Sequence, residues 1–219
     1  MDATQEIFQC SIFRSIEDEN FKKELFATGY LKKYPRGSCL ISPQQELNHF
    51  GVILRGKIHT LHQFSDGNCS IMDVLEELDV FGADLICTKS RIAPYHAVAA
   101  ADTELLLFPW YLPFIPGHLS EPLRQTLQLR LLQLVANSNI QKEYRLAILS
   151  QKGLRERITT YLQMQAAKRQ VQSFEIPFSR EDLASFLCVN RSALSHELSK
   201  MQTEGIIRYH KNHFTLLSK

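Results

Sequence analysis

The stretch "SREDLASFLCVNRSALSHELSKM", residues 179–201, contains the pattern that decides the fold of the C-terminal part of the chain. Ser179 followed three residues later by Asp182 matches a capping box, so a short helix is predicted to begin there. "CVN" then turns the chain, and Asn190 is predicted to cap a second helix. The apolar residues of this second helix lie at i, i+4 and i+7 and must face a core: Leu194, Leu198 and Met201.

The opposite side of the second helix is polar and carries no acid. It presents Arg191, Ser192, Ser195, His196 and Ser199, and it is flanked by Glu197 and Lys200. Serine, arginine and histidine can hydrogen-bond base edges or phosphates. Two short helices joined by three residues predict a helix-turn-helix, whose second helix enters the major groove of DNA.

The next segment, "GIIRYHKNHFTLLS" at residues 205–218, predicts two short strands about a Lys-Asn turn. Such a hairpin is the wing of a winged helix, and Arg208, His210, Lys211 and His213 are available to phosphates. A surface helical hairpin with no role in nucleic-acid binding stays open as an alternative. The predicted DNA contacts are Ser179, Arg180, Arg191, Ser192, Ser195, His196, Ser199, Lys200, Arg208 and Lys211.

Residues 30–110 alternate short apolar runs with turn chemistry. "HFGVIL", "KIHTLHQF", "SIMDVL" and "ELLLFPW" are rich in β-branched and aromatic residues. The "SDGN" between two of these runs predicts a tight hairpin, because Asp-Gly accepts the positive φ of such a turn. Regularly spaced strands of this kind indicate a sandwich or barrel.

Composition narrows the class of protein. A chain of 219 residues with 44% hydrophobic and 22% charged residues can bury the cores of two domains. No run approaches the roughly eighteen apolar residues of a membrane span, and the start lacks a signal-peptide pattern, so a cytoplasmic protein without membrane contact is expected. Five scattered cysteines without CxxC spacing argue against a disulfide framework or a structural zinc site. From residue 151 onward 11 Lys and Arg face 6 Asp and Glu, a weak sign of a polyanionic partner.

A long helix is predicted over residues 120–148, because Ser120 can cap it and some thirty residues follow without Gly or further Pro. Leu123, Leu127, Leu131 and Leu134 form one apolar stripe, and Leu129, Leu132 and Ala136 form a second on another side. Two faces require two partners, the β domain and the same helix of a second subunit. We place the subunit seam at Leu127 and Leu134. A central helix buried within one chain remains an alternative.

The whole chain resembles the Crp/Fnr family of bacterial transcription regulators, through "SREDLASFLCVNRSALSHELSKMQTEGIIRYHKNHFTL" and more loosely through "YPRGSCLI", "ILRGKI" and "DVFGAD". The resemblance implies an α+β fold: an N-terminal β-roll of the cyclic-nucleotide-binding, jelly-roll type, a long dimerisation helix and a C-terminal winged helix-turn-helix. Its expected domains are an effector-sensing β-roll at 1–118, the helix and hinge at 119–152 and a DNA-binding domain at 153–219. It also implies a homodimer on a two-fold symmetric double-stranded operator, with RNA polymerase as a further candidate partner.

Departures from the family pattern concern the effector. Ala83 stands where cyclic-AMP-binding members carry a glutamate, and Pro94 and Tyr95 stand where they carry Arg and Ser, so cyclic AMP is not expected. Cys10 is the single N-terminal cysteine, which excludes the iron-sulfur sensor of the oxygen-sensing branch, and no cofactor or metal is expected. An unidentified small effector remains, with candidate contacts at Ala83, Asp84, Lys89, Arg91, Tyr95, His96, Asn137, Ser138 and Asn139. Residues 137–139 could instead set the register of the dimer.

Two further expectations concern the helix-turn-helix and the alternatives to it. Ser192, Ser195 and His196 replace the Glu, Ser or Gly, and Arg of many family members, so the operator is expected to differ from the usual half-site. Cys188 fills the turn position usually held by glycine and is a redox candidate, against the alternative of an inert packing residue. An enzyme is not expected, because GxGxxG, Walker, HExxH and GxSxG motifs are missing from the sequence. A ligand-binding or interaction protein with a vestigial DNA-binding domain stays open.

Overall fold

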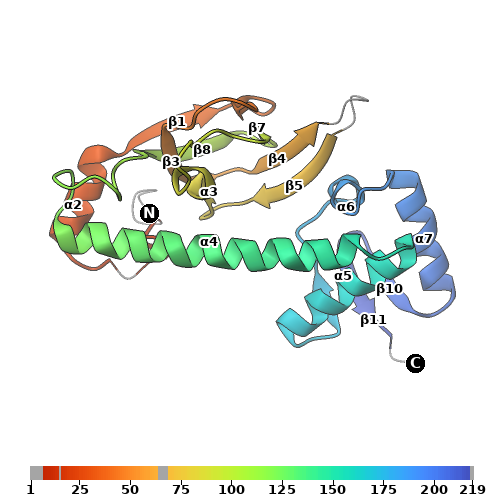
Figure 1. Ribbon diagram of the computed structural model, residues 1–219. Coiled ribbons are helices and arrows are strands. Elements are labelled where there is room, and N and C mark those ends of the chain that lie inside the picture. The colour runs from red at the N-terminus through yellow and green to blue at the C-terminus, as the bar shows by residue number, and fades with distance from the viewer. Residues whose placement is uncertain (1–6, 15, 64–68, 218–219) are drawn as a thin grey trace. The chain divides into compact units, whose positions relative to one another are not determined.

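The structure is a computed structural model that describes residues 7–14, 16–63 and 69–217 (Figure 1). The predicted Asp66-Gly67 turn lies outside these residues. Two compact units divide the chain, one made of residues 1–68 and 72–139 and the other of residues 69–71 and 140–219. None of the helices in the described ranges combines the length and the hydropathy that crossing a membrane requires.

The first unit contains two four-stranded sheets, which confirms the predicted β-roll. Both sheets are antiparallel in the pairings seen, and buried side chains of both enter one hydrophobic core. β3 is buried along most of its length, since its neighbours β8 and β6 cover both of its edges. One sheet has the order β1 (Tyr30–Tyr34), β8 (Thr103–Pro109), β3 (His49–Arg55), β6 (Val80–Phe81); the other has β2 (Cys39–Ile41), β7 (His96–Ala99), β4 (Ile58–Gln63), β5 (Cys69–Leu75).

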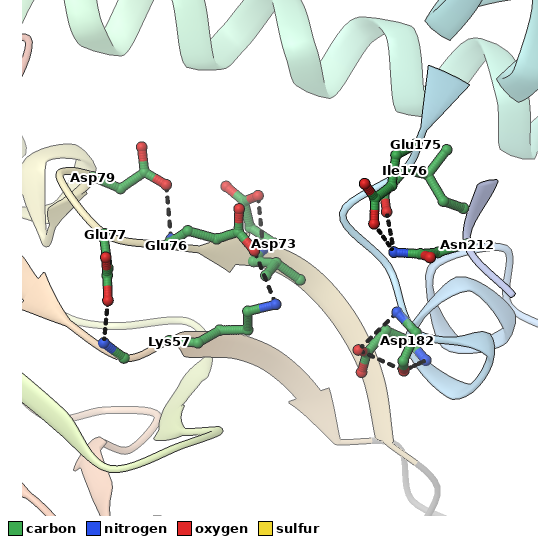
Figure 2. A network of polar contacts seen from close by, with 12 residues as sticks. Lys57, Asp73, Glu76, Glu77, Asp79, Glu175, Ile176, Asp182 and Asn212 are labelled. Atoms are coloured by element: carbon green, nitrogen blue, oxygen red, sulfur yellow. Dashed lines mark hydrogen bonds and ion pairs between the residues drawn. The ribbon is translucent and has the colours of Figure 1, made fainter. Parts of the chain in front are cut away.

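Polar contacts close the turns of this β-roll. Lys57 Nζ lies 2.9 Å from Glu76 Oε1, and the carboxylate of Asp79 accepts the Glu76 amide proton at 2.8 Å (Figure 2). Burial raises the pKa of Asp79, since that carboxyl group is largely removed from water. The bond to the Glu76 amide gives this backbone donor a partner in the loop between β5 and β6. Both contacts hold this loop, which leads to α3 (Ala83–Ile86).

The helices of the first unit pack around the β-roll core. They are the short 3-10 helix η1 (Ile7–Gln9), α2 (Glu19–Thr28), α3 and residues 121–139 of the long α4 (Glu121–Leu149). Ser120 begins α4 as predicted, since its carbonyl accepts from the Arg124 amide at 3.0 Å. The Ser120 amide and hydroxyl both donate to Glu24 Oε2 at 2.9 Å. Glu24 therefore places a negative charge at the positive end of the helix dipole.

The first apolar stripe of α4 packs inside its own chain. Leu127 is 1% exposed and lies in the β-roll core with Leu123 and Leu131, and Leu134 packs against that core. The seam predicted at Leu127 and Leu134 is therefore wrong, because both side chains are taken up by the first unit. The face that remains for a partner is the second stripe.

The second unit is a winged helix, as predicted. Its core joins Ile148 near the end of α4 to apolar residues of every later element. Since α4 contributes to both cores, the limits 1–118, 119–152 and 153–219 remain a prediction. The elements are α5 (Leu154–Arg169), β9 (Ser173–Glu175), α6 (Arg180–Phe186), α7 (Arg191–Thr203), β10 (Ile207–His210) and β11 (His213–Leu216), with the sheet order β10-β11-β9.

Candidate nucleic-acid interface

The two helix starts of the helix-turn-helix are capped as the sequence predicts. Ser179 Oγ accepts from the Asp182 amide at 3.1 Å, and Asp182 Oδ2 accepts from the Ser179 hydroxyl at 2.7 Å and from its amide at 3.3 Å (Figure 2). Asn190 Oδ1 caps α7 by accepting from the Ala193 amide at 2.8 Å, and it also accepts from the Ser192 hydroxyl at 2.9 Å. The Ser179 hydroxyl is thus engaged within the cap.

The two faces of α7 separate as predicted. Leu194, Leu198 and Met201 are fully buried in the core of the winged helix. The predicted contact residues lie on the other side: Arg191, Ser192, His196, Ser199 and Lys200 are exposed, and Ser195 is half-buried. The structure therefore gathers these candidates on one solvent-facing surface of a single helix.

An arginine from α5 pairs with Glu197 of α7 and with Glu204, the residue that caps the C-terminus of α7. Arg155 Nε donates to Glu197 Oε1 at 2.6 Å, while its Nη1 and Nη2 donate to the two carboxylate oxygens of Glu204 at 2.6 and 3.1 Å. The hydrogen bonds that Arg155 donates, first to Glu204 and then to Glu197, raise the pKa of Arg155. Because Glu197 is the one acid within α7, this contact removes a charge that would oppose DNA.

Two more arginines bind the end of α6. Arg157 donates to the carbonyl oxygen of Leu187 at 3.2 Å and to that of Gln151 at 3.0 Å. Arg145 donates to the Phe186 carbonyl at 3.2 Å and lies over the Phe186 ring, 4.6 Å from its centroid. Both cations thus meet the negative end of a helix. The sequence does not reveal these contacts of Arg145, Arg155 and Arg157, since nothing in local spacing marks partners 30 or more residues away.

The wing is fixed at its turn. Asn212 Nδ2 donates to Glu175 Oε1 at 2.6 Å (Figure 2), and the Asn212 carbonyl accepts from the Ile176 amide at 2.9 Å. The Tyr209 amide donates to Gln202 Oε1 of α7 at 2.9 Å. The basic side chains of the hairpin are exposed: Arg208, His210, Lys211 and His213.

Arg180 has partners inside the winged helix. It is half-buried, and its Nη2 donates to the Lys211 carbonyl at 2.8 Å. Its guanidinium lies 5.0 Å from the ring centroid of Tyr209 and 5.6 Å from that of Phe214. Burial lowers the pKa of Arg180. Among the ten predicted contacts, four side chains thus have hydrogen-bond partners within the winged helix itself: Ser179, Arg180, Ser192 and Ser199.

Cys188 lies just after α6, and its backbone adopts the left-handed helical conformation, with φ of 56°. Its amide donates to the Ser185 carbonyl at 3.1 Å, and the Val189 amide donates to the Ala184 carbonyl at 2.9 Å, as at a helix end that reverses direction. The side chain is exposed, so little packing compensates for the backbone conformation. The redox role of Cys188 stays a prediction.

Cys188→Gly is expected to stabilise the winged helix by about 1 kcal/mol, because glycine adopts this φ without a side-chain clash. The midpoint of denaturant unfolding, followed by circular dichroism, measures the change. Cys188→Ala removes the thiol but keeps a Cβ, so it is the control and should leave the midpoint nearly unchanged. Equal midpoints for the glycine and alanine variants would show that the turn is unstrained.

In the β-roll, the structure joins two of the predicted effector contacts. The Tyr95 hydroxyl donates to both carboxylate oxygens of Asp84 at 3.0 Å. Burial, followed by the neighbouring Asp84 charge, raises the pKa of Tyr95. Gly82 precedes Ala83 with φ of 81°, and a Cβ there would meet the Leu47 side chain at 2.4 Å, so this turn requires glycine. Ala83 itself is buried.

The other predicted effector contacts have varied surroundings. Arg91 pairs with Glu46 and lies 3.8 Å from the ring centroid of Trp110. Lys89 is exposed and His96 is half-buried at the start of β7. On α4, Asn137 and Asn139 are exposed and Ser138 is half-buried.

Two family models match the chain. Residues 31–110 match the cyclic nucleotide-binding domain, and residues 156–219 match the Crp-like helix-turn-helix domain. Together they cover the β-roll strands and the winged helix described above. The chain belongs to the Crp/Fnr family. It is therefore a Crp-like transcription regulator with an effector-binding domain and a DNA-binding helix-turn-helix domain. Its homologues are regulators rather than enzymes.

Individual Crp/Fnr relatives are distant. A probable transcriptional activator from Rhizobium leguminosarum bv. viciae is 23% identical over 85% of this chain and 76% of its own length. FixK2 from Bradyrhizobium japonicum matches with a TM-score of 0.66 and 19% identity over 86% of this chain and 92% of its own. The c-di-GMP responsive regulator CLP from Xanthomonas campestris matches with a TM-score of 0.70 and 13% identity. The match covers 92% of this chain and 100% of the CLP chain. The two structures show likeness of fold.

Crp/Fnr regulators act as dimers, and one face of α4 is suited to that role. Leu129 is 57% exposed and Leu132 is 65% exposed. Ala136 and Ile140 continue this stripe along the helix and are exposed as well. The first three of these residues form the second stripe that the sequence predicts, and Ile140 extends this face by another turn.

Proposed function

We propose that this regulator is a homodimer that binds a two-fold symmetric operator through α7 and changes its operator affinity when a small effector occupies the β-roll. The observation that carries the proposal is the α7 surface: three fully buried apolar side chains oppose an exposed basic face, and the acid that flanks this face, Glu197, is paired with Arg155. The N-terminal residues of a recognition helix are the ones that reach base edges, and here they are Arg191, Ser192, Ser195 and His196.

The wing supplies the backbone contacts in this proposal. Arg208 and Lys211 are exposed cationic side chains on the hairpin, so they suit phosphates rather than particular bases. Phosphate contacts set register and affinity, whereas base contacts set sequence preference. The two groups should therefore respond differently to substitution.

The proposed effector is not cyclic AMP. The buried Ala83 has no carboxylate for a ribose, and Arg91, the cation nearest in sequence to Pro94 and Tyr95, is paired with Glu46. Cys10 is buried and burial raises the pKa of its thiol, which disfavours the thiolate that an iron-sulfur cluster needs. The name of CLP as c-di-GMP responsive supports the view that this fold serves other effectors.

Selection of genomic fragments by the protein, followed by titration of the recovered operator, tests the DNA assignment. His196→Ala is expected to relax preference at one operator position by about 1–3 kcal/mol, because it removes a base contact. Lys211→Ala should weaken binding to all sequences and lower the salt slope by about one. If His196→Ala changed the salt slope alone, His196 would be a backbone contact.

Cyclic AMP is expected to give no binding heat in calorimetry up to millimolar concentration. Its phosphate would need a free cation, and Arg91 is engaged by Glu46 and by the Trp110 ring. Glu46→Gln is the informative companion variant, since it releases Arg91 from its ion pair. Micromolar affinity of the unaltered protein for cyclic AMP would contradict the proposal.

A further inference from the structure

We infer that Arg180 supports DNA binding as a positioning residue that fixes the wing, and that it does not itself bind a phosphate. This inference rests on the proposed function, in which the wing holds the DNA backbone. It assigns to the first residue of α6 a task different from that of Arg191, the first residue of α7. Both are arginines at helix starts, but their surroundings differ.

The surroundings of Arg180 are built by the wing. Tyr209 of β10 pairs directly with Phe214 of β11, and their rings stack with centroids 5.7 Å apart. The guanidinium of Arg180 lies over both rings, a placement in which the ring faces attract a cation. Tyr209 is in turn held from α7, where its hydroxyl lies 3.4 Å from Ser199 Oγ. The stacked rings of Tyr209 and Phe214 thus connect the wing to α7, and Arg180 connects α6 to the same two rings.

Arg180 donates a hydrogen bond to the turn of the wing. Its acceptor is the carbonyl oxygen of Lys211, at 2.8 Å. Lys211 has φ of 55°, a conformation that a non-glycine residue holds only when its neighbours enforce it. Arg180 supports this residue from one side and Asn212, through Glu175, supports the turn from the other. The exposed Lys211 ammonium is thereby carried on a fixed backbone.

The surroundings of Arg191 suit a direct DNA contact, whereas those of Arg180 suit a positioning role. Arg191 is exposed at the start of α7, so its guanidinium can reach a nucleic acid without giving up an internal partner. Arg180 is half-buried, and moving to a phosphate would break its bond to Lys211 and expose two aromatic faces. A preorganised side chain of this kind contributes by holding other contacts in place.

A double-mutant cycle in operator binding tests the inference. The background is a wing-neutral variant, Arg208→Ala with Lys211→Ala. In the unaltered wing, Arg180→Ala is expected to weaken operator binding by about five-fold or more, whereas in the wing-neutral background it should have less than about a two-fold effect. Arg191→Ala is the matched control and should cost the same factor in both backgrounds.

The outcomes separate the inference from the proposed function. Equal effects of Arg180→Ala in both backgrounds would overturn the inference, since Arg180 would then contact DNA directly. A wing-neutral variant with unchanged affinity would also overturn it, because the wing would make no contact worth positioning, while operator binding itself would stand. If the unaltered protein selected no operator at all, the proposed function would fail first.

Hydrogen exchange of the free protein gives a readout without DNA. Arg180→Ala is expected to speed exchange of the Ile176 amide, which donates to Asn212 in the wing turn, and to leave the buried middle of α7 protected. Arg180→Lys keeps a cation over the rings and should restore part of the protection. Unchanged exchange at Ile176 in Arg180→Ala would overturn the inference, and so would loss of protection throughout α7, which would indicate general unfolding.

Discussion

Leu129→Glu combined with Leu132→Glu is expected to convert the dimer to a monomer and to weaken operator binding by about a hundred-fold or more. Both side chains are more than half exposed on α4, and two carboxylates there would face their symmetry-related copies in an apolar seam. Each half-site would then be bound independently, which forfeits the gain from linked binding. Light scattering gives the mass, and titration of the operator gives the affinity.

Gln141→Glu is the matched control for this pair. It also adds a carboxylate to an exposed position of α4, but about 120° around the helix from Leu129. Mass and affinity should stay unchanged in the control. A dimeric mass for the Leu129 and Leu132 double variant would show that subunits meet elsewhere.

Leu127 shows what helical periodicity can and cannot predict. The spacing of leucines predicted a long helix with two apolar stripes, and both stripes are present. Spacing gives the angle between stripes but not the identity of what each stripe meets. That choice depends on the β-roll, whose core takes up Leu127 and leaves Leu132 exposed. The subunit seam was therefore assigned to the wrong stripe.

The helix-turn-helix was predicted closely because its determinants are local. The caps at Ser179 and Asn190 act over three residues, and the buried side of α7 follows from the helical repeat of 3.6 residues per turn. The contacts of Arg155 and Arg180 span 42 and 31 residues, and no spacing rule encodes such partners. Sequence alone therefore placed Arg180 among the DNA contacts without showing its place beneath the wing.

The surroundings of the predicted effector contacts could be foreseen only in part. Family resemblance and turn chemistry pointed to the segment after Gly82 and to Tyr95, and the structure joins Tyr95 to Asp84. Arg91 was predicted as an effector contact, but its ion pair with Glu46 and its place over Trp110 come from parts of the chain far apart in sequence. Recognition of a ligand depends on such tertiary partners, because they decide which charges remain available.

Arg155→Ala is expected to weaken binding to all DNA sequences by about ten-fold at low salt, and to lower the salt slope by about one. The substitution removes the cation that binds Glu197 of α7 and Glu204 at the C-terminal cap of α7, so two carboxylates lose this partner beside a polyanion. Sequence preference should be unchanged, because no base contact is lost. Titrations of operator and unrelated DNA over a range of salt concentrations measure both effects.

Two controls decide whether Arg155 acts through these carboxylates. Lys152→Ala removes an exposed cation from the same segment, and it should cost less than Arg155→Ala if the specific contacts matter more than net charge. Arg155→Ala combined with Glu197→Gln and Glu204→Gln leaves no uncompensated charge and should regain affinity. If this triple variant bound as weakly as Arg155→Ala, repulsion from α7 would not be the cause. Equal losses for Lys152→Ala and Arg155→Ala would show that only the overall charge of the winged helix counts.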